Sequence, residues 1–249
     1  MNILISNVKD GDFMGISITQ INQDTYLLSD NSSKLYLNST VIFTNKGPII
    51  VDVFRDKEMF KQICNFINSK GWNKPLAIIY THWHIDHTCG NQLFKNSRII
   101  SHKDTYRYLE NFIKNHLKRL KVKGILKKDV NPLLPTETFE NEIVLDLGNK
   151  TLRLIHSPGH TYDSILVYDV NERVLITGDN IIGKEVTFFM PPVIPPDKPD
   201  ANHKDLEKTY EIISTLNPKT IIPGHGNLIE ADKLLSYNKK RYKECLEKI

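Results

Sequence analysis

The chain has 249 residues, of which 40% are hydrophobic and 25% are charged. This composition is typical of a globular protein that buries a core without disulfide staples. The formal net charge of +4 favours a lysine-rich solvated surface over nucleic-acid binding. Bound divalent metals would add positive charge at a site, so the sequence does not exclude an anionic substrate. Three cysteines with no close pair argue against a disulfide framework and fit a reducing compartment.

The sequence predicts no N-terminal secretory signal. The first fifteen residues lack a basic stretch followed by an apolar run, and no window approaches the ~18 consecutive apolar residues of a membrane span. The sequence therefore predicts a cytoplasmic protein with no membrane partner. It contains no internal repeat or low-complexity linker, so we expect residues 1–249 to form a single domain. A homo-oligomer stays open.

The first half of the chain predicts short strands followed by helices. Apolar residues at helical spacing indicate a helix over 56–70 that ends at Gly71, and β-branched and aromatic runs indicate strands. The expected strands are 16–21, 25–28, 39–44, 49–51, 76–80 and 97–102, and a second helix is expected over 103–120. Residues 121–138 have weak periodicity and two prolines, so we expect a loop or insertion there.

The second half repeats this rhythm. The expected strands are 142–145, 151–156, 164–168, 174–177 and 220–222. Helices are expected over 204–216, ending before Pro218, and from Ala231 to the C-terminus. Strands followed by helices in each half predict an α+β fold of two sheets with helices on their outer faces.

Three histidines and an aspartate lie within six residues, in the segment THWHIDH at 81–87. In an extended segment, His82 and His84 point to the same side, because side chains alternate along the backbone. Asp86 and His87 follow where the chain turns toward a helix and can address a second position nearby. Imidazole and carboxylate are ligands that zinc favours. One short segment is therefore predicted to begin two metal sites.

Three further candidate ligands each follow a strand-like run and lie on a glycine-bearing turn. They are His160 in Pro-Gly-His, Asp179 in Gly-Asp, and His225 in Gly-His. Each motif alone is ordinary turn chemistry. Together they share one arrangement, in which a strand is followed by a tight loop that carries a candidate ligand.

These motifs together resemble those of the metallo-β-lactamase superfamily. The match comprises the His-x-His-x-Asp-His string, the later Pro-Gly-His, the Gly-Asp and the final Gly-His, and it runs from about Val41 to Gly226. Asp52 matches the family's early aspartate at a strand end. The resemblance implies a four-layer αββα sandwich with the site at one edge.

The resemblance also implies two divalent metal ions, with zinc favoured and iron or manganese as alternatives. The implied ligands of the first ion are His82, His84 and His160. The implied ligands of the second ion are Asp86, His87 and His225. Asp179 would bridge the two ions, and Asp52 would orient the His-rich loop without binding metal.

Residue differences among branches of the superfamily limit the reactions that the resemblance implies for this chain. Flavodiiron-type oxidoreductases carry Glu where His84 stands, and imidazole there favours zinc and hydrolysis. True β-lactamases of the family generally lack an aspartate corresponding to Asp179, so this chain is more similar to the glyoxalase II and lactonase branches. Only 24 residues follow His225, whereas glyoxalase II enzymes carry a substantial helical extension, and 183–193 offers no lactonase-like tyrosine.

The resulting hypothesis is a dinuclear metal-dependent hydrolase that cleaves an ester, thioester or lactone bond of a small-molecule substrate with a metal-bridging hydroxide. Asp86 is the candidate catalytic residue, which would orient the nucleophile or accept its proton. The alternatives are a phosphodiesterase or nuclease of the same fold, an iron-dependent oxidoreductase, and a β-lactamase-like activity.

Several features remain open at this point. The Pro-rich segment 183–196 either caps the pocket or packs against the body of the protein or a second subunit. Trp83 lines the pocket or belongs to the core. The lysine-rich stretch 103–128 recruits an anionic substrate or is a solvated helix face. Cys89 is expected to be a free buried thiol.

Overall fold

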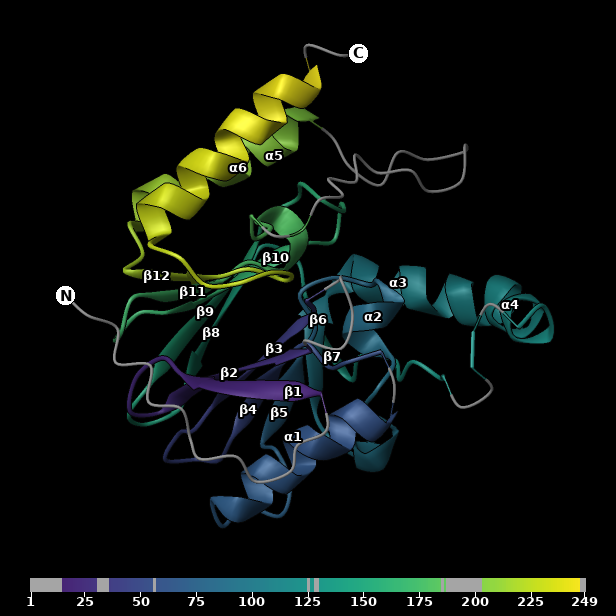
Figure 1. The fold of residues 1–249 in the computed structure, drawn as a ribbon. Helices are drawn as coiled ribbons and strands as arrows, with labels where there is room; N and C mark the ends of the chain where they lie inside the picture. The colour runs from purple at the N-terminus through teal and green to yellow at the C-terminus, as the bar shows by residue number, and fades with distance from the viewer. Residues whose placement is uncertain are drawn as a thin grey trace.

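The computed structural model describes residues 15–30, 36–55, 57–124, 126–127, 130–184, 186 and 203–246. Within these residues two β-sheets pack face to face, and helices cover both outer faces (Figure 1). The predicted α+β, four-layer αββα sandwich is confirmed.

The first sheet has seven strands in the described residues, in the order in which they occur along the chain. They are β1 (Ile16–Gln20), β2 (Thr25–Asp30), β3 (Asn38–Ile42), β4 (Ile49–Val51), β5 (Ala77–Ile79), β6 (Ile99–His102) and β7 (Glu137–Phe139). Strands β1 to β4 pair antiparallel, and β4 to β7 pair parallel. The carboxyl ends of β4, β5 and β6 therefore meet at one edge of the sheet.

The second sheet has five strands in the described residues. In spatial order they are β12 (Thr220–Ile222), β11 (Val174–Ile176), β10 (Ile165–Asp169), β9 (Thr151–His156) and β8 (Glu142–Asp146). Strands β11 and β12 are parallel, and β10 is antiparallel to both β9 and β11. The carboxyl ends of β9, β11 and β12 consequently lie at one edge of the second sheet.

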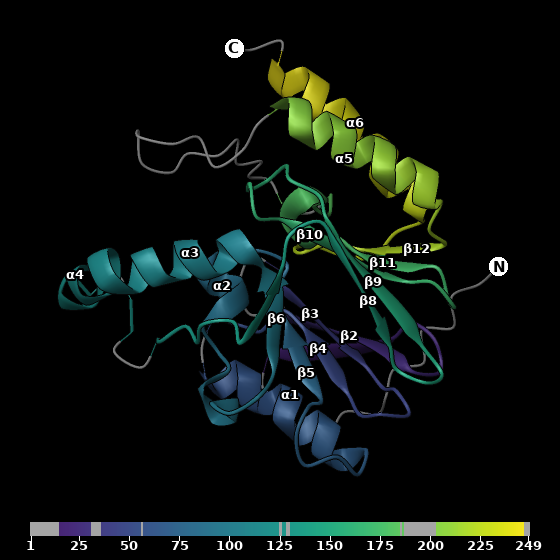
Figure 2. The same cartoon turned by 180° about the vertical axis from the view of Figure 1, so that it is seen from behind.

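A continuous apolar core fills the space between the sheets, with side chains such as Ile79 and Leu154 fully buried. Helix α1 (Lys57–Ser69) covers the first sheet with Phe60, Ile63, Phe66 and Ile67, which recur at the helical spacing seen in the sequence. Helices α5 (His203–Leu216) and α6 (Ala231–Leu246) cover the second sheet (Figure 2).

The segment after β6 departs from the sequence prediction. The expected helix over 103–120 consists of α3 (Lys103–Phe112), a π-helical turn (Ile113–Leu117) and α4 (Lys118–Val122). The prediction of a loop over 121–138 is wrong at its end, because β7 begins at Glu137. Three residues are too few to show a period, and β7 owes its place to pairing with β6 and to a bidentate Arg98–Glu137 ion pair.

A buried lysine joins the two sheets at the edge opposite the ends of β4, β11 and β12. Lys150 Nζ lies 3.2 Å from Asp169 Oδ2 at the end of β10 and 3.6 Å from Asp24 Oδ2 in the β1–β2 turn. Lys150 is 2% exposed and Asp169 is 1% exposed, so neither charge is solvated. Removing one partner of such a buried pair leaves the other charge buried and uncompensated, which costs far more than breaking a surface pair.

Replacing Lys150 with methionine is expected to lower the free energy of unfolding by about 3–5 kcal/mol, because Asp169 would remain buried without its counter-charge. Urea unfolding measures this. Lys46→Met is the matched control, since Lys46 is exposed at the same edge and should cost less than about 0.5 kcal/mol. Equal losses in the two variants would contradict the assignment.

None of the helices in the described part of the chain is long and apolar enough to cross a membrane.

Candidate metal centre

All seven predicted ligands come together at the edge where β5, β9, β11 and β12 end. The first four follow β5: His82 and His84 lie in the loop, and Asp86 and His87 lie on the single-turn helix α2 (Ile85–Thr88). The other three lie in the β9–β10 loop, the short helical turn η3 (Gly178–Asn180) after β11, and the turn after β12: His160, Asp179 and His225.

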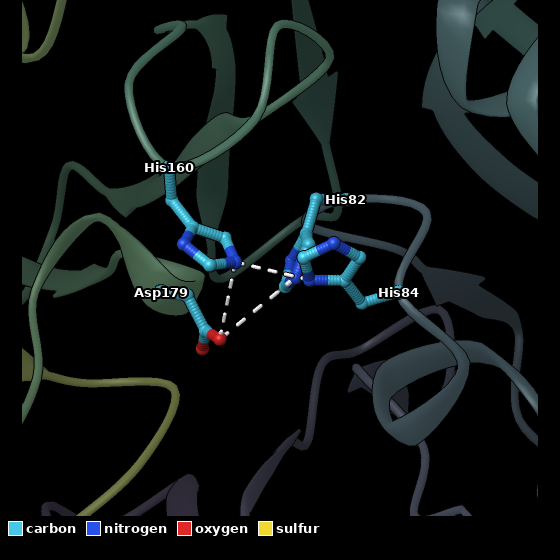
Figure 3. A group of neighbouring side chains, drawn as sticks. All are labelled: His82, His84, His160 and Asp179. Atoms are coloured by element: carbon cyan, nitrogen blue, oxygen red, sulfur yellow. Dashed lines mark hydrogen bonds and ion pairs between the residues drawn. The ribbon is translucent and has the colours of Figure 1, made fainter. Parts of the chain in front are cut away.

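One group of side chains converges on a single point (Figure 3). It consists of His82, His84, His160 and Asp179, whose candidate ligand atoms all lie within 4.8 Å of one another. His160 Nε2 lies 3.0 Å from His84 Nδ1 and 3.5 Å from Asp179 Oδ2. His82 Nε2 lies 3.9 Å from the same carboxylate oxygen.

A second group lies beside the first and consists of Asp86, His87 and His225. His87 Nε2 and His225 Nε2 are 3.3 Å apart, and Asp86 Oδ2 lies 3.5 Å from His225 Nε2. The imidazole rings of His82 and His87 link the groups, with centroids 4.4 Å apart.

Asp179 lies between the two groups and touches both. Its Oδ1 is 3.3 Å from His87 Nε2, and its Oδ2 is 3.3 Å from His225 Nε2. Gly224 makes room for it, because a Cβ at that position would lie 2.0 Å from Asp179 Oδ1 and 2.7 Å from the carbonyl carbon of Gly178. Only glycine therefore fits next to this carboxylate.

Asp52 is hydrogen-bonded to the segment 81–87, which carries the first four candidate ligands. It follows β4 with a φ of 58°, a left-handed conformation that aspartate tolerates better than most residues. Its carboxylate accepts hydrogen bonds from Thr81 N and Thr81 Oγ1, both at 2.7 Å, and from His87 Nδ1 at 2.9 Å. Because His87 Nδ1 is bonded to Asp52, His87 Nε2 faces the cluster. This contact is the one expected of a residue that orients a metal ligand without binding the metal.

Two buried asparagines that sequence reasoning missed clamp the remaining loops. Asn180 accepts from His160 N at 2.8 Å and donates to Ser157 O at 2.9 Å. Asn38, on β3, donates to the carbonyl oxygens of Pro223 and Gly226, on either side of His225. Asn180 follows Asp179 directly in the sequence, but nothing in either motif reveals the partners of its amide.

The donor set fits divalent metal ions. His82 Nε2 is buried and has no hydrogen-bond partner among the described residues, although it faces the other ring nitrogens. Two ligands held about 2.1 Å from a tetrahedral ion stand about 3.4 Å apart. Four distances between candidate ligand atoms within the groups, 3.0, 3.5, 3.8 and 3.9 Å, surround this value.

The electrostatics of the two groups differ. Burial, followed by the neighbouring imidazoles of His87 and His84, holds the pKa of His82 well below its usual range, so this ring stays neutral as a metal ligand must. Burial also lowers the pKa of His87, but the carboxylates of Asp179, Asp86 and Asp52 outweigh it and raise that pKa well above normal. The three carboxylates around His87 thus favour positive charge at the second group, which a bound cation would supply in place of a proton.

Of the histidines without a predicted ligand role, His102 and His156 stack face to face with ring centroids 3.9 Å apart. In the tautomer its partners require, His102 donates from Nε2 to Glu140 O and accepts at Nδ1 from Asp104 N, which caps α3. Burial and then the adjacent His156 lower the pKa of His102 to about 4, against the pull of Asp104.

This shift predicts a loss of stability in acid. The unfolded chain binds a proton at His102 below pH 6.5, whereas the folded chain binds it only near pH 4, so stability falls as the pH drops through this window. Asparagine also caps helices. His102→Asn should therefore lose less stability between pH 8 and pH 5 than the wild type in urea unfolding. Identical losses in both proteins would contradict this pKa direction.

The fold and the site together define a class of protein: an αββα sandwich with paired His/Asp groups at one edge. The family model of the metallo-beta-lactamase superfamily matches residues 34–225, and the chain belongs to this superfamily.

Known relatives extend this result. The chain is 24% identical over 174 residues to acyl-coenzyme A thioesterase MBLAC2 of Gallus gallus, covering 65% of this chain and 60% of that protein's length. It is 30% identical over 205 residues to a probable metallo-hydrolase of Methanocaldococcus jannaschii, covering 78% and 89%. A metallo-beta-lactamase from Pontibacter korlensis shares the fold with a TM-score of 0.71, at 17% identity over 92% of this chain and 99% of the other.

Proposed function

We propose that the chain is a metal-dependent hydrolase that cleaves the acyl–sulfur bond of a small-molecule thioester. The observation that carries the proposal is the pair of His/Asp groups sharing Asp179 at one edge of the sandwich. The thioester is chosen among the ester, thioester and lactone substrates because the chicken relative is named an acyl-coenzyme A thioesterase.

Two divalent metal ions, with zinc favoured over iron or manganese, would be held by the seven side chains described above. The ligands of the first would be His82, His84 and His160. The ligands of the second would be Asp86, His87 and His225, with Asp179 between the two. The bound metals would supply Lewis acidity for the carbonyl and a water acidic enough to attack near neutral pH.

Asp86 is the group of the chain best placed to handle the proton of the attacking water. Its side chain is 27% exposed, whereas Asp179 is 7% exposed and the cluster histidines His82, His87 and His225 are 0–3% exposed. Burial raises its pKa, but His87 and His225 outweigh this and lower it, so Asp86 is ionised at neutral pH. An ionised carboxylate at the mouth of the site accepts a hydrogen bond or a proton from water.

The test is turnover of a substrate panel by zinc-loaded wild type, His87→Ala and a control, Asp146→Ala, on the exposed end of β8. The panel contains a thioester, a lactone, an aryl ester, a β-lactam and a phosphodiester. We expect thioester hydrolysis that falls at least about 10³-fold in His87→Ala and is unchanged in Asp146→Ala. Turnover of the phosphodiester alone would replace the proposal by a nuclease or phosphodiesterase, and a lactone or ester preference would replace its substrate.

The segment 183–196, predicted as a substrate lid or a packed loop, lies mainly outside the described residues and carries no part of this proposal.

A further inference from the structure

The net positive charge of the chain comes from one segment. Residues 103–130 hold nine lysines and arginines against three acidic residues, whereas the rest of the chain holds 24 against 26. The described residues of 103–127, here called the basic arm, comprise α3, the π-helical turn, α4 and the turn that follows. Without this arm, the chain would carry a net negative charge.

The base of the arm packs directly on the segment that carries the candidate ligands. Cys89, Phe112 and Leu117 form a small buried cluster against which Trp83 also packs. The Trp83 ring lies 4.8 Å from the His84 ring and 6.3 Å from the Phe112 ring, centroid to centroid. Cys89 is thus a free thiol buried under the arm, and burial raises its pKa to about 12.

Beyond this base the arm points away from the sandwich. Both views show α3 beside α2, with α4 extending outward (Figures 1 and 2). Near the base, Arg107 and Lys114 are paired with Asp104 and Glu110. Farther out, three exposed basic side chains have no acidic partner in the described part of the chain: Lys118, Arg119 and Lys123.

We propose that the basic arm binds the phosphates of a nucleotide thioester, an acyl-coenzyme A, while the thioester lies at the candidate metal centre. The inference rests on the proposed function and adds the surface that recognises the thiol half of the substrate. Lysine and arginine are the side chains that bind phosphate groups, and clustered positive charge steers anionic substrates toward a site.

The dimensions agree with this occupant. The Trp83 ring separates Phe112 from the His84 ring, and Lys118 lies roughly 9 Å farther along the helix axis at ~1.5 Å per residue, so the path from His84 to Lys118 is about 20 Å. The pantetheine chain of coenzyme A has about thirteen bonds between sulfur and the first phosphorus, which span at most ~15 Å when extended, and a lysine or arginine side chain reaches about 6 Å from its Cα. A thioester held beside His84 therefore places its first phosphate within reach of Lys118 and Arg119, and the nucleotide end of the substrate extends farther along the arm toward Lys123.

Direct binding tests the arm without any hydrolysis. The probe is 3′-phosphoadenosine 5′-diphosphate, which lacks the thiol and so cannot use it as a metal ligand. The variant Lys118→Glu/Arg119→Glu/Lys123→Glu is compared with Lys61→Glu/Lys74→Glu/Lys219→Glu, which changes the net charge equally at exposed lysines elsewhere. We expect the Kd to rise at least about tenfold in the arm variant only, and wild-type binding to weaken with added salt.

Kinetics separates this inference from the proposed function. In the arm variant, the KM for an acyl-coenzyme A should rise at least about tenfold with kcat retained, while hydrolysis of the same acyl group on pantetheine should be unchanged. Equal kinetics and equal nucleotide binding in both charge variants would overturn the role of the arm and leave thioester hydrolysis standing. If the wild type hydrolyses neither thioester, the proposed function fails, and nucleotide binding alone decides the arm.

A nucleic acid is the competing occupant of a basic surface. Loss of binding to a single-stranded oligonucleotide in the arm variant, with unchanged affinity for the nucleotide probe, would overturn the inference in favour of a nucleic-acid surface.

Discussion

Asp179→Asn is expected to lose at least about 10³-fold in kcat/KM and to bind fewer than two metal ions per chain. The carboxylate lies 3.3 Å from both His87 Nε2 and His225 Nε2 and 3.5 Å from His160 Nε2, so both His/Asp groups depend on it. Asparagine removes the negative charge and presents an N–H₂ group that cannot bind metal. Turnover and metal analysis by mass spectrometry measure the two effects.

Asp86→Asn is the informative comparison, because the Asp86 carboxylate lies within 4 Å of His87 Nε2 and His225 Nε2, both in the second group. We expect this variant to weaken the second ion while retaining the first, whereas Asp179→Asn weakens both. Asp146→Asn, on the exposed end of β8, serves as a control with no expected effect. Full activity and full metal content in Asp179→Asn would show that this carboxylate does not join the two groups.

The second large effect is expected for Asp52→Ala. Its carboxylate holds the Thr81 backbone, the Thr81 hydroxyl and His87 Nδ1, all of them buried. Removing it leaves these donors unsatisfied, and alanine fits the φ of 58° poorly. We expect the metal-free protein to lose about 2–4 kcal/mol of unfolding free energy and metal affinity to fall about 10–100-fold.

Asp52→Asn separates the two causes of this loss. Asparagine tolerates the left-handed backbone and keeps one acceptor oxygen, so it should recover part of the stability measured in urea. The metal affinity should stay low, because only one oxygen remains to accept from both Thr81 and His87. Wild-type metal affinity in both variants would mean that Asp52 does not position the ligands.

The sequence predicted the fold through its apolar pattern. The helix over 57–69 buries one face at helical spacing, and the strands 25–30 and 151–156 are runs of β-branched, aromatic and other apolar residues, so local sequence marks them without knowledge of their partners. The strand 137–139 was missed because its placement depends on β6, and the π-helical turn was missed because 113–117 keeps a helical pattern.

The sequence also predicted which side chains meet at the site, because they follow strands whose ends share one edge. What it did not predict are the contacts that set their geometry. The amides of Asn38 and Asn180 bond to carbonyl oxygens and a backbone N–H of loops distant in the chain, and such contacts leave no local pattern. The anchoring of the basic arm through Cys89 and Trp83 is equally non-local, so the sequence predicts a buried thiol at Cys89 but not the contact of either residue with the arm.

Titration of the chelated protein with zinc tests the central claim most directly. Zinc bound per chain and thioester turnover would be measured on the same samples. The account predicts no turnover in the metal-free protein, saturation near two ions per chain as expected from two His/Asp groups, and turnover that rises with occupancy. Undiminished thioester hydrolysis by the metal-free protein, or zinc binding at full occupancy with no hydrolysis of any panel substrate, would contradict it.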